Sequence, residues 1–217
     1  VGDFLASASE RPLSPQLAES RGPLPEVGRD AREVLDEARS LLDASMNPLH
    51  AGYLGHMDST PSLMSLVGDF AAAAVNNNLL SVEMAPAFSR LEWDITRGFS
   101  DRFGLPEGAG GVMCAGGTIA NLHALAVARN VRLGVGAGGL AGLDRRPVIV
   151  ASADAHTSLH KAAMLLGLVT DAVATVAVDD RSRMRVDALR ATVARLRSSG
   201  SEPFCVVATA GTTTTAE

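Results

Sequence analysis

The sequence predicts an α/β fold built on a mainly parallel sheet, and two patterns support this prediction. After Gly104, short apolar runs alternate strictly with amphipathic segments that are long enough for helices. The glycine-rich stretch 134–142 is typical of a flexible surface loop between a helix and the next strand. Strict alternation implies right-handed crossovers that place helices on both faces of the sheet. We expect strands at 111–114, 147–152, 172–178 and 204–210, and helices at 118–133, 157–168 and 186–198.

The first part of the chain has a different pattern and is expected to be helical after an initial arm. Residues 1–29 are rich in proline and small polar residues, which disfavours regular helix over much of this length and indicates an arm wrapped on a partner. From Asp30, apolar side chains recur at helical spacing and predict an amphipathic helix. A mostly apolar helix is expected at 62–75, and Pro86 opens another. We expect both of these helices to face the core.

Composition limits the classes of function. The 217 residues carry 24 acidic and 19 basic groups, a net charge of −5, and 47% of them are hydrophobic. These values are typical of a globular protein and give no electrostatic reason to expect a nucleic-acid partner. The apolar stretches fall far short of the roughly 20 residues that a membrane span needs. The two cysteines form no disulfide framework, and no Cys/His spacing suggests a metal site. A cytoplasmic protein is therefore expected.

Small and hydroxyl-bearing residues follow the first predicted strand. The run from Ala115 to Thr118 opens a helix, where free backbone N–H groups and the Thr118 hydroxyl could bind a phosphate. The run is neither a Walker loop nor a GxGxxG turn. A phosphate cradle and a plain tight turn are both compatible with these residues.

Two further strand ends carry polar side chains. His156 follows the strand at 147–152, where it could either contact a ligand or merely cap the next helix. Four threonines at 212–215 follow the last predicted strand. Ligands of parallel sheets lie outside the carboxyl ends of the strands, so these groups should meet. Together they predict a site for a phosphorylated cofactor with a flat polar ring, for which pyridoxal 5'-phosphate is the natural candidate.

Five segments, in unbroken order over roughly residues 30–217, resemble the group II pyridoxal-phosphate-dependent amino acid decarboxylases. They are Asn76-Asn77-Asn78-Leu79-Leu80, Phe88-Ser89-Arg90-Leu91-Glu92, Gly116-Gly117-Thr118-Ile119-Ala120-Asn121, Ala155-His156-Thr157-Ser158 and Ala208-Thr209-Ala210-Gly211-Thr212-Thr213. This group includes glutamate, aromatic L-amino acid, cysteine sulfinate and L-2,4-diaminobutyrate decarboxylases. The resemblance implies a carboxy-lyase that converts an L-amino acid to the amine and CO2.

The resemblance also implies an architecture. The expected fold is the three-layer, aspartate aminotransferase-like fold of type I pyridoxal-phosphate enzymes. Residues 1–103 would form an N-terminal arm and helical segment that wraps a second subunit, and 104–217 would form the first part of the cofactor-binding large domain. A homodimer with a shared active site is therefore expected.

Site residues follow from the same resemblance. Gly117 and Thr118 match the phosphate-binding pair, and His156 matches the catalytic histidine that stacks on the pyridine ring. Thr213 matches the threonine near the polar edge of the cofactor.

Substrate recognition is assigned to the loop around His56 and Ser59. His56 replaces the aromatic residue of the aromatic amino acid decarboxylases, which weighs against an aromatic substrate. With Asp58, it favours a cationic or polar substrate such as diaminobutyrate.

Two family residues have no counterpart in the 217 residues. The aspartate on the pyridine nitrogen and the Schiff-base lysine are expected beyond Glu217, so the chain is interpreted as an incompetent fragment. Lys161, the single lysine, lies on a predicted helix with its Cα pointing away from the cradle, and we interpret it as a surface or interface residue. The alternatives are an aldehyde synthase or aminotransferase on the same fold, or a non-catalytic partner subunit.

Overall fold

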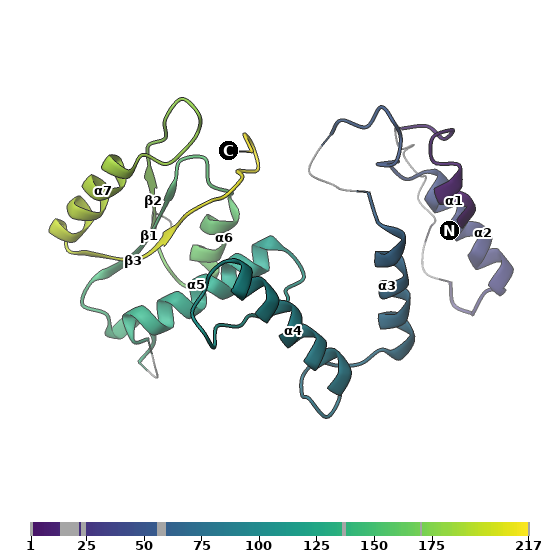
Figure 1. The fold of residues 1–217 in the computed structure, drawn as a ribbon, viewed down its shortest axis with the longest axis horizontal. Helices are drawn as coiled ribbons and strands as arrows, with labels where there is room; N and C mark the ends of the chain where they lie inside the picture. The colour runs from purple at the N-terminus through teal and green to yellow at the C-terminus, as the bar shows by residue number, and fades with distance from the viewer. Residues whose placement is uncertain are drawn as a thin grey trace. The chain divides into compact units, whose positions relative to one another are not determined.

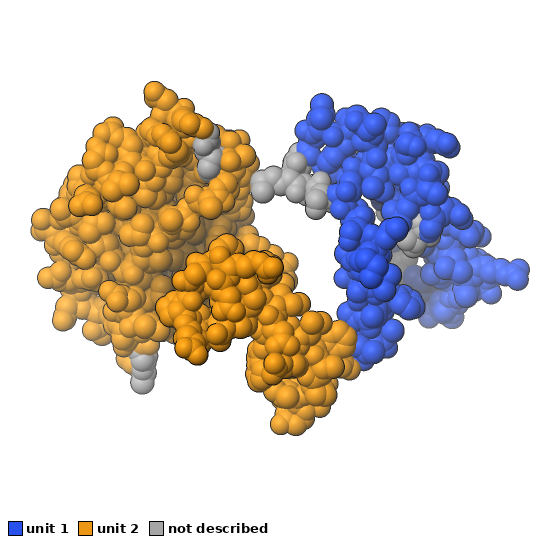
Figure 2. Space-filling view, viewed as in Figure 1, with its two compact units in different colours: residues 1–76 blue, residues 77–217 orange. Residues whose placement is uncertain are grey.

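A computed structural model describes most of the chain as two compact units, residues 1–76 and 77–217 (Figure 2). The described residues are 2–13, 22, 25–55, 60–135, 138–169 and 171–216. None of the helices in these ranges is long and apolar enough to cross a membrane. Helix α4 (Pro86–Arg102) falls in the second unit. The functional boundary that we predict after residue 103 remains a prediction.

The described residues of the first unit, residues 1–76, form the helices α1, α2 and α3 (Figure 1). Helix α1 (Gly2–Ala6) is a short helix inside the segment where we expected little regular structure. Helix α2 (Ala31–Asp43) begins after Asp30, whose carboxylate accepts a hydrogen bond from the backbone N–H of Arg32 at 2.8 Å. The buried Asn47 side chain donates to the Ala8 carbonyl at 2.6 Å, which holds the end of the α1 segment against the residues that follow α2.

Helix α3 (Leu63–Val75) has the predicted bounds but not the predicted surroundings. The Ser62 hydroxyl accepts from the Ser65 N–H at 3.1 Å and caps its start, and Asn76 ends it with a left-handed φ of 45°. No residue of α3 is buried in the described structure, and Phe70 is 77% exposed. The expectation that this helix faces the core is therefore wrong for the described residues. It is wrong for α4 as well, whose buried residues are Ser89, Thr96 and Ser100, while Leu91, Ile95 and Phe99 are 50%, 40% and 53% exposed.

The second unit is built on a parallel sheet of three described strands in the order β2-β1-β3. These strands are β1 (Arg146–Ser152), β2 (Val173–Val176) and β3 (Ser201–Val207). The central strand β1 is buried from Val148 to Ser152, which explains its continuous apolar sequence. A register irregularity follows Val148, whose partner is Pro203, a residue with no N–H to donate to the ladder.

Helices cover both faces of this sheet (Figure 1). On one face, Ile149 and Ala151 pack with residues of α5 (Gly117–Leu133) and α6 (Ser158–Leu165). On the other face, Val148 and Val150 pack with Leu196 of α7 (Val186–Ser198). This three-layer arrangement confirms the predicted α/β fold and places the start of α6 beside the sheet, where Leu159 packs in the same cluster as Ile149.

Two sequence expectations around α5 need correction. Residues 111–114 form no strand; instead, the Met113 N–H donates to a Glu92 carboxylate oxygen on α4 at 2.7 Å. A strand requires a neighbour for its backbone groups, and this segment pairs with none of the described strands. In the stretch after α5, expected as a loop, Gly139–Gly142 forms a short 3-10 helix, and Leu140 packs against the core.

Candidate cofactor site

The start of α5 offers hydrogen-bond donors to an anion. The first intrahelical bond runs from the Ala120 N–H to the Gly116 carbonyl at 3.0 Å, so the N–H groups before Ala120 have no acceptor within the helix. A side chain at Gly116 or Gly117 would meet no atom of the described structure within 4 Å, so the backbone here is open to a ligand. The exposed Thr118 hydroxyl adds a donor, and the helix dipole favours negative charge. This set fits a phosphate group.

His156 lies in the turn between β1 and α6. Its Nδ1 accepts a hydrogen bond from the Ser158 N–H at 3.1 Å, so the side chain does satisfy one N–H at the start of α6. The residue as a whole is exposed. The capping and ligand-contacting interpretations of His156 are therefore compatible, because one ring nitrogen is engaged locally and the ring remains accessible.

Asn121 joins these two parts of the site. Its side-chain amide, on the second turn of α5, donates to the hydroxyl of Ser158, the first residue of α6, at 2.9 Å. Ser158 has 0% of its surface exposed. The sequence showed both residues inside the quoted segments, but spacing alone gave no sign that they contact each other. The bond connects the Gly117–Thr118 cradle to the turn that carries His156.

The hydroxyl run after β3 divides into a buried and an exposed residue. Thr212 is 4% exposed, and its Oγ1 accepts from the Thr215 N–H at 3.0 Å and contacts the Thr215 hydroxyl. Thr213, the residue that we predicted at the cofactor, is exposed. Gly211 precedes them with a φ of +79°, a conformation that favours glycine. Thr212 thus shapes the turn, and a cofactor contact of Thr213 stays a prediction.

A small cavity of about 140 Å³ lies at the carboxyl ends of β1 and β3. Its lining residues are Ser152, Ser182, Arg183, Met184, Ala208, Thr209 and Thr212. The Arg183 guanidinium donates to the Asp179 carboxylate at 2.9 Å, and the Arg183 backbone N–H donates to the same carboxylate at 3.0 Å. These bonds lower the pKa of Asp179 from 3.8 to about 2. The turn after β2 therefore borders the carboxyl ends of β1 and β3.

Other predicted residues have plainer positions. His56 and Ser59 lie outside the described residues. Lys161 is exposed on α6, and the Nδ1 of His50 accepts from the Gly52 N–H at 3.0 Å, a local turn contact. His123 lines an open groove of about 840 Å³ along α5.

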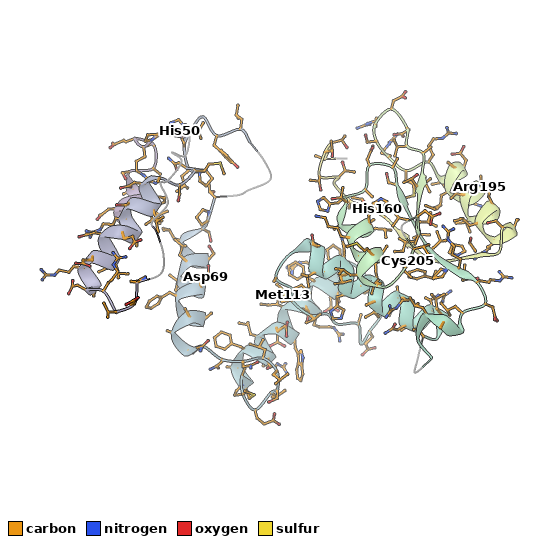
Figure 3. The ribbon with its side chains drawn as sticks, turned by 180° about the vertical axis from the view of Figure 1, so that it is seen from behind. His50, Asp69, Met113, His160, Arg195 and Cys205 are labelled. Carbon is orange, nitrogen blue, oxygen red and sulfur yellow. The ribbon has the colours of Figure 1, made fainter. Side chains whose placement is uncertain are left out.

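The cysteines and acidic groups show no metal centre in the described ranges. Cys205 lies on β3 (Figure 3), and burial raises the pKa of its thiol, which keeps it a weak nucleophile. Among the described residues, no group of three or more His, Cys, Asp or Glu side chains could hold a metal ion.

Comparison with known proteins decides the family. Residues 15–217 match the model of the pyridoxal-dependent decarboxylase conserved domain. The chain belongs to the pyridoxal-dependent decarboxylase family. This confirms the predicted family and, with it, pyridoxal phosphate as the cofactor.

Individual relatives agree with this family. An L-2,4-diaminobutyrate decarboxylase of Rhizobium meliloti is 34% identical over 91% of the chain and 39% of the relative. An L-aspartate decarboxylase of Metarhizium robertsii is 34% identical over 81% of the chain and 35% of the relative. A human cysteine sulfinic acid decarboxylase is 29% identical over 86% of the chain and 38% of the relative. The chain thus spans about two fifths or less of the length of these relatives.

Solved structures confirm the aspartate aminotransferase-like fold. The crystal structure of mouse CSAD matches with a TM-score of 0.83 and 30% identity, over 88% of the chain and 40% of that structure. The decarboxylase domain of a Vibrio parahaemolyticus diaminobutyrate enzyme matches with a TM-score of 0.87 and 24% identity, over 100% of the chain and 50% of that structure. The latter likeness concerns the fold alone.

Proposed function

We propose that the full-length protein is a pyridoxal-phosphate-dependent decarboxylase that converts an L-amino acid to the amine and CO2. The observation that carries this proposal is the match of residues 15–217 to the pyridoxal-dependent decarboxylase domain. The Asn121–Ser158 hydrogen bond of 2.9 Å supports it, because it joins the start of α5 to the turn of His156. The donors at the α5 start fit the phosphate, and the accessible imidazole fits the ring. When bound, the cofactor withdraws electrons from the carbon that loses CO2.

The residues of this chain would bind and orient the reactants. Gly117, through its backbone, and Thr118, through its hydroxyl, would bind the phosphate and fix one end of the cofactor. His156 would contact the ring face and fix its plane, and Thr213 would lie near its polar edge. Fixing both ends of a flat ring restricts its orientation, which is the main contribution that a protein makes to this chemistry.

The substrate that we propose has a small, polar or cationic side chain, with L-2,4-diaminobutyrate as the leading candidate. His56 stands where aromatic decarboxylases have an aromatic residue, and Asp58 could accept a hydrogen bond from an ammonium group. The relatives named above act on diaminobutyrate, aspartate and cysteine sulfinic acid according to their names, and all three substrates are polar.

We also propose a cytoplasmic homodimer with a shared active site. The support for a dimer is α3, whose large apolar side chains Met64, Val67 and Phe70 are 74%, 57% and 77% exposed. Apolar side chains gathered on one helix are typical of a surface that another chain covers. The acidic composition and the unpaired cysteines agree with a cytoplasmic location.

The test uses the purified full-length protein. Its mass is measured before and after borohydride reduction, and a panel of amino acids is assayed for CO2, amine and ammonia. We expect a pyridoxyl adduct on a lysine, and equal amounts of amine and CO2 from diaminobutyrate. Absence of the adduct contradicts the cofactor assignment. Ammonia release without stoichiometric amine indicates an aldehyde synthase, and turnover of aromatic substrates alone contradicts the proposed substrate.

A further inference from the structure

Two hydrogen bonds in series lead from α5 to the His156 ring. The Asn121 amide donates to the Ser158 hydroxyl at 2.9 Å, and the Ser158 backbone N–H donates to His156 Nδ1 at 3.1 Å. Ser158 is fully buried, whereas His156 is exposed. The first bond thus has one end that is fully buried, while the second ends on a side chain that a ligand can reach.

The second bond determines which ring nitrogen of His156 carries the proton. A nitrogen that accepts an N–H must be unprotonated, so neutral His156 holds its proton on Nε2. The imidazolium form has no free lone pair, and forming it would break the bond from Ser158. The ring therefore presents an N–H donor at Nε2.

The first bond fixes where this ring is held. Asn121 follows Gly117 by four residues on α5, so the two lie on the same face of the helix, one turn apart. Without Asn121, the buried Ser158 hydroxyl would lose its side-chain partner, and a buried polar group without a partner is costly. The start of α6 would relieve that cost by shifting, and the N–H that orients His156 would move with it.

We infer that Asn121 is a positioning residue, which acts through Ser158 to keep His156 in its Nε2–H form at a fixed place beside the phosphate cradle. The inference rests on the proposed function, because it concerns how His156 meets the cofactor ring. Asn121 itself need not contact the cofactor for this role.

The test measures the tautomer of His156 by NMR in the full-length protein, with ¹⁵N in its imidazole rings. The His156 signal is assigned as the one that is lost in His156→Gln. We expect the unprotonated nitrogen to be Nδ1, with or without cofactor. Asn121→Ala and Ser158→Ala should each shift the tautomer ratio toward Nδ1–H by about fivefold, the effect of one ordinary hydrogen bond. The double variant should shift it less than Asn121→Ala alone, because it leaves no buried hydroxyl without a partner.

The matched control is Arg129→Met. Arg129 also joins α5 to α6, since its guanidinium donates to the Leu166 carbonyl at 2.9 Å, but it does so at the other end of α6. It should leave the tautomer unchanged. An Nδ1–H form in the native protein, an unchanged ratio in both alanine variants, or an equal shift in Arg129→Met would each overturn the inference.

A second readout separates this inference from the proposed function. In the loaded protein, circular dichroism of the cofactor band reports how firmly the ring is oriented, and we expect it to weaken in Asn121→Ala and Ser158→Ala but not in Arg129→Met. A native protein that binds no pyridoxal phosphate contradicts the proposed function. The tautomer of the cofactor-free protein still decides the role of Asn121.

Discussion

Strand β1 of the sheet unit and helix α3 of the first unit are both rich in apolar residues, but they differ in how far those residues are buried. In the sheet unit, β1 buries five successive residues, Val148 to Ser152, between helices on both faces. In the first unit, α3 is more apolar than most helices of the chain, yet none of its residues is buried in the described structure. Strand β1 contributes its apolar residues to the core of its own unit, whereas α3 leaves its apolar residues exposed.

The difference teaches that apolar content alone does not locate a core. Strand β1 is buried because the connections between parallel strands place helices on both faces of the sheet. Helix α3 has no such neighbour among the described residues. We expect changes in β1 to act on folding and changes in α3 to act on association, and the predictions below test this contrast in order of decreasing effect.

The largest effect is expected for Ile149→Ala, in the middle of β1. Ile149 has 0% of its surface exposed and packs with α5 and α6, so truncation leaves a cavity. The free energy of unfolding should fall by about 3 kcal/mol, measured by denaturant unfolding of the full-length protein. Val206→Ala on β3, where Val206 is 47% exposed, is the control and should cost far less. Equal losses would show that the sheet has no such core.

The next effect is expected for Phe70→Ser on α3. If a second subunit covers Phe70, removing the ring weakens dimerisation by about 2 kcal/mol, the size of an interface hot spot. Sedimentation equilibrium measures the dimer dissociation constant, and the free energy of unfolding of the sheet unit should stay unchanged. Asp69→Asn, on the same helix (Figure 3), is the control for surface charge. An unchanged dissociation constant would contradict the assignment of α3 to the interface.

The sequence predicted the bounds of helices closely where a local pattern determines them. Helices α3 and α7 begin and end within one residue of their expected bounds, because each has a clear periodicity, and a capping serine marks the start of α3. The segment 111–114 was wrongly predicted as a strand, since its apolar residues resemble β1 but find no neighbouring strand. Strand pairing depends on residues far away in the chain, which a local pattern does not contain.

The candidate site was predictable in its residue types and not in its connections. A strand-to-helix junction pointed to His156, and small residues at a helix start pointed to Gly117 and Thr118, although the strand expected before them does not form. The cofactor contacts of all three residues stay predictions. The Asn121–Ser158 bond spans 37 positions, so only the packing of α5 on α6 reveals it. After β3, Thr212 is buried and Thr213 is exposed, a division that the run of four threonines did not indicate, and the cofactor contact of Thr213 stays a prediction.

A smaller effect is expected for Ser182→Gly, in the turn after β2. Ser182 has a φ of +61°, which strains any residue with a Cβ. Glycine should raise the free energy of unfolding by about 0.5 kcal/mol. Ser198→Gly, at the end of α7, is the control and should lower it by a similar amount, because no positive φ exists there to relieve. A lower free energy of unfolding in both variants would show that glycine does not stabilise the turn.

The smallest effect is expected from the charge of Asp179, and it should appear only in acid. Hydrogen bonds from the side chain and backbone of Arg183 lower the pKa of Asp179 from 3.8 to about 2 in the folded state. A carboxyl with a lowered folded pKa stabilises the fold above its unfolded pKa, and this contribution is lost as the pH falls from about 4 to about 2. Asp179→Asn should therefore reduce stability at neutral pH and flatten its decline over that window, measured by denaturant unfolding at each pH. Asp180→Asn, which removes the same charge next to it, should keep the native slope. Asp179 is partly exposed, so added salt should shrink the difference between the two variants. A difference that persists in high salt would show that the hydrogen-bond geometry of the turn, rather than the charge of Asp179, sets the acid response of the sheet unit.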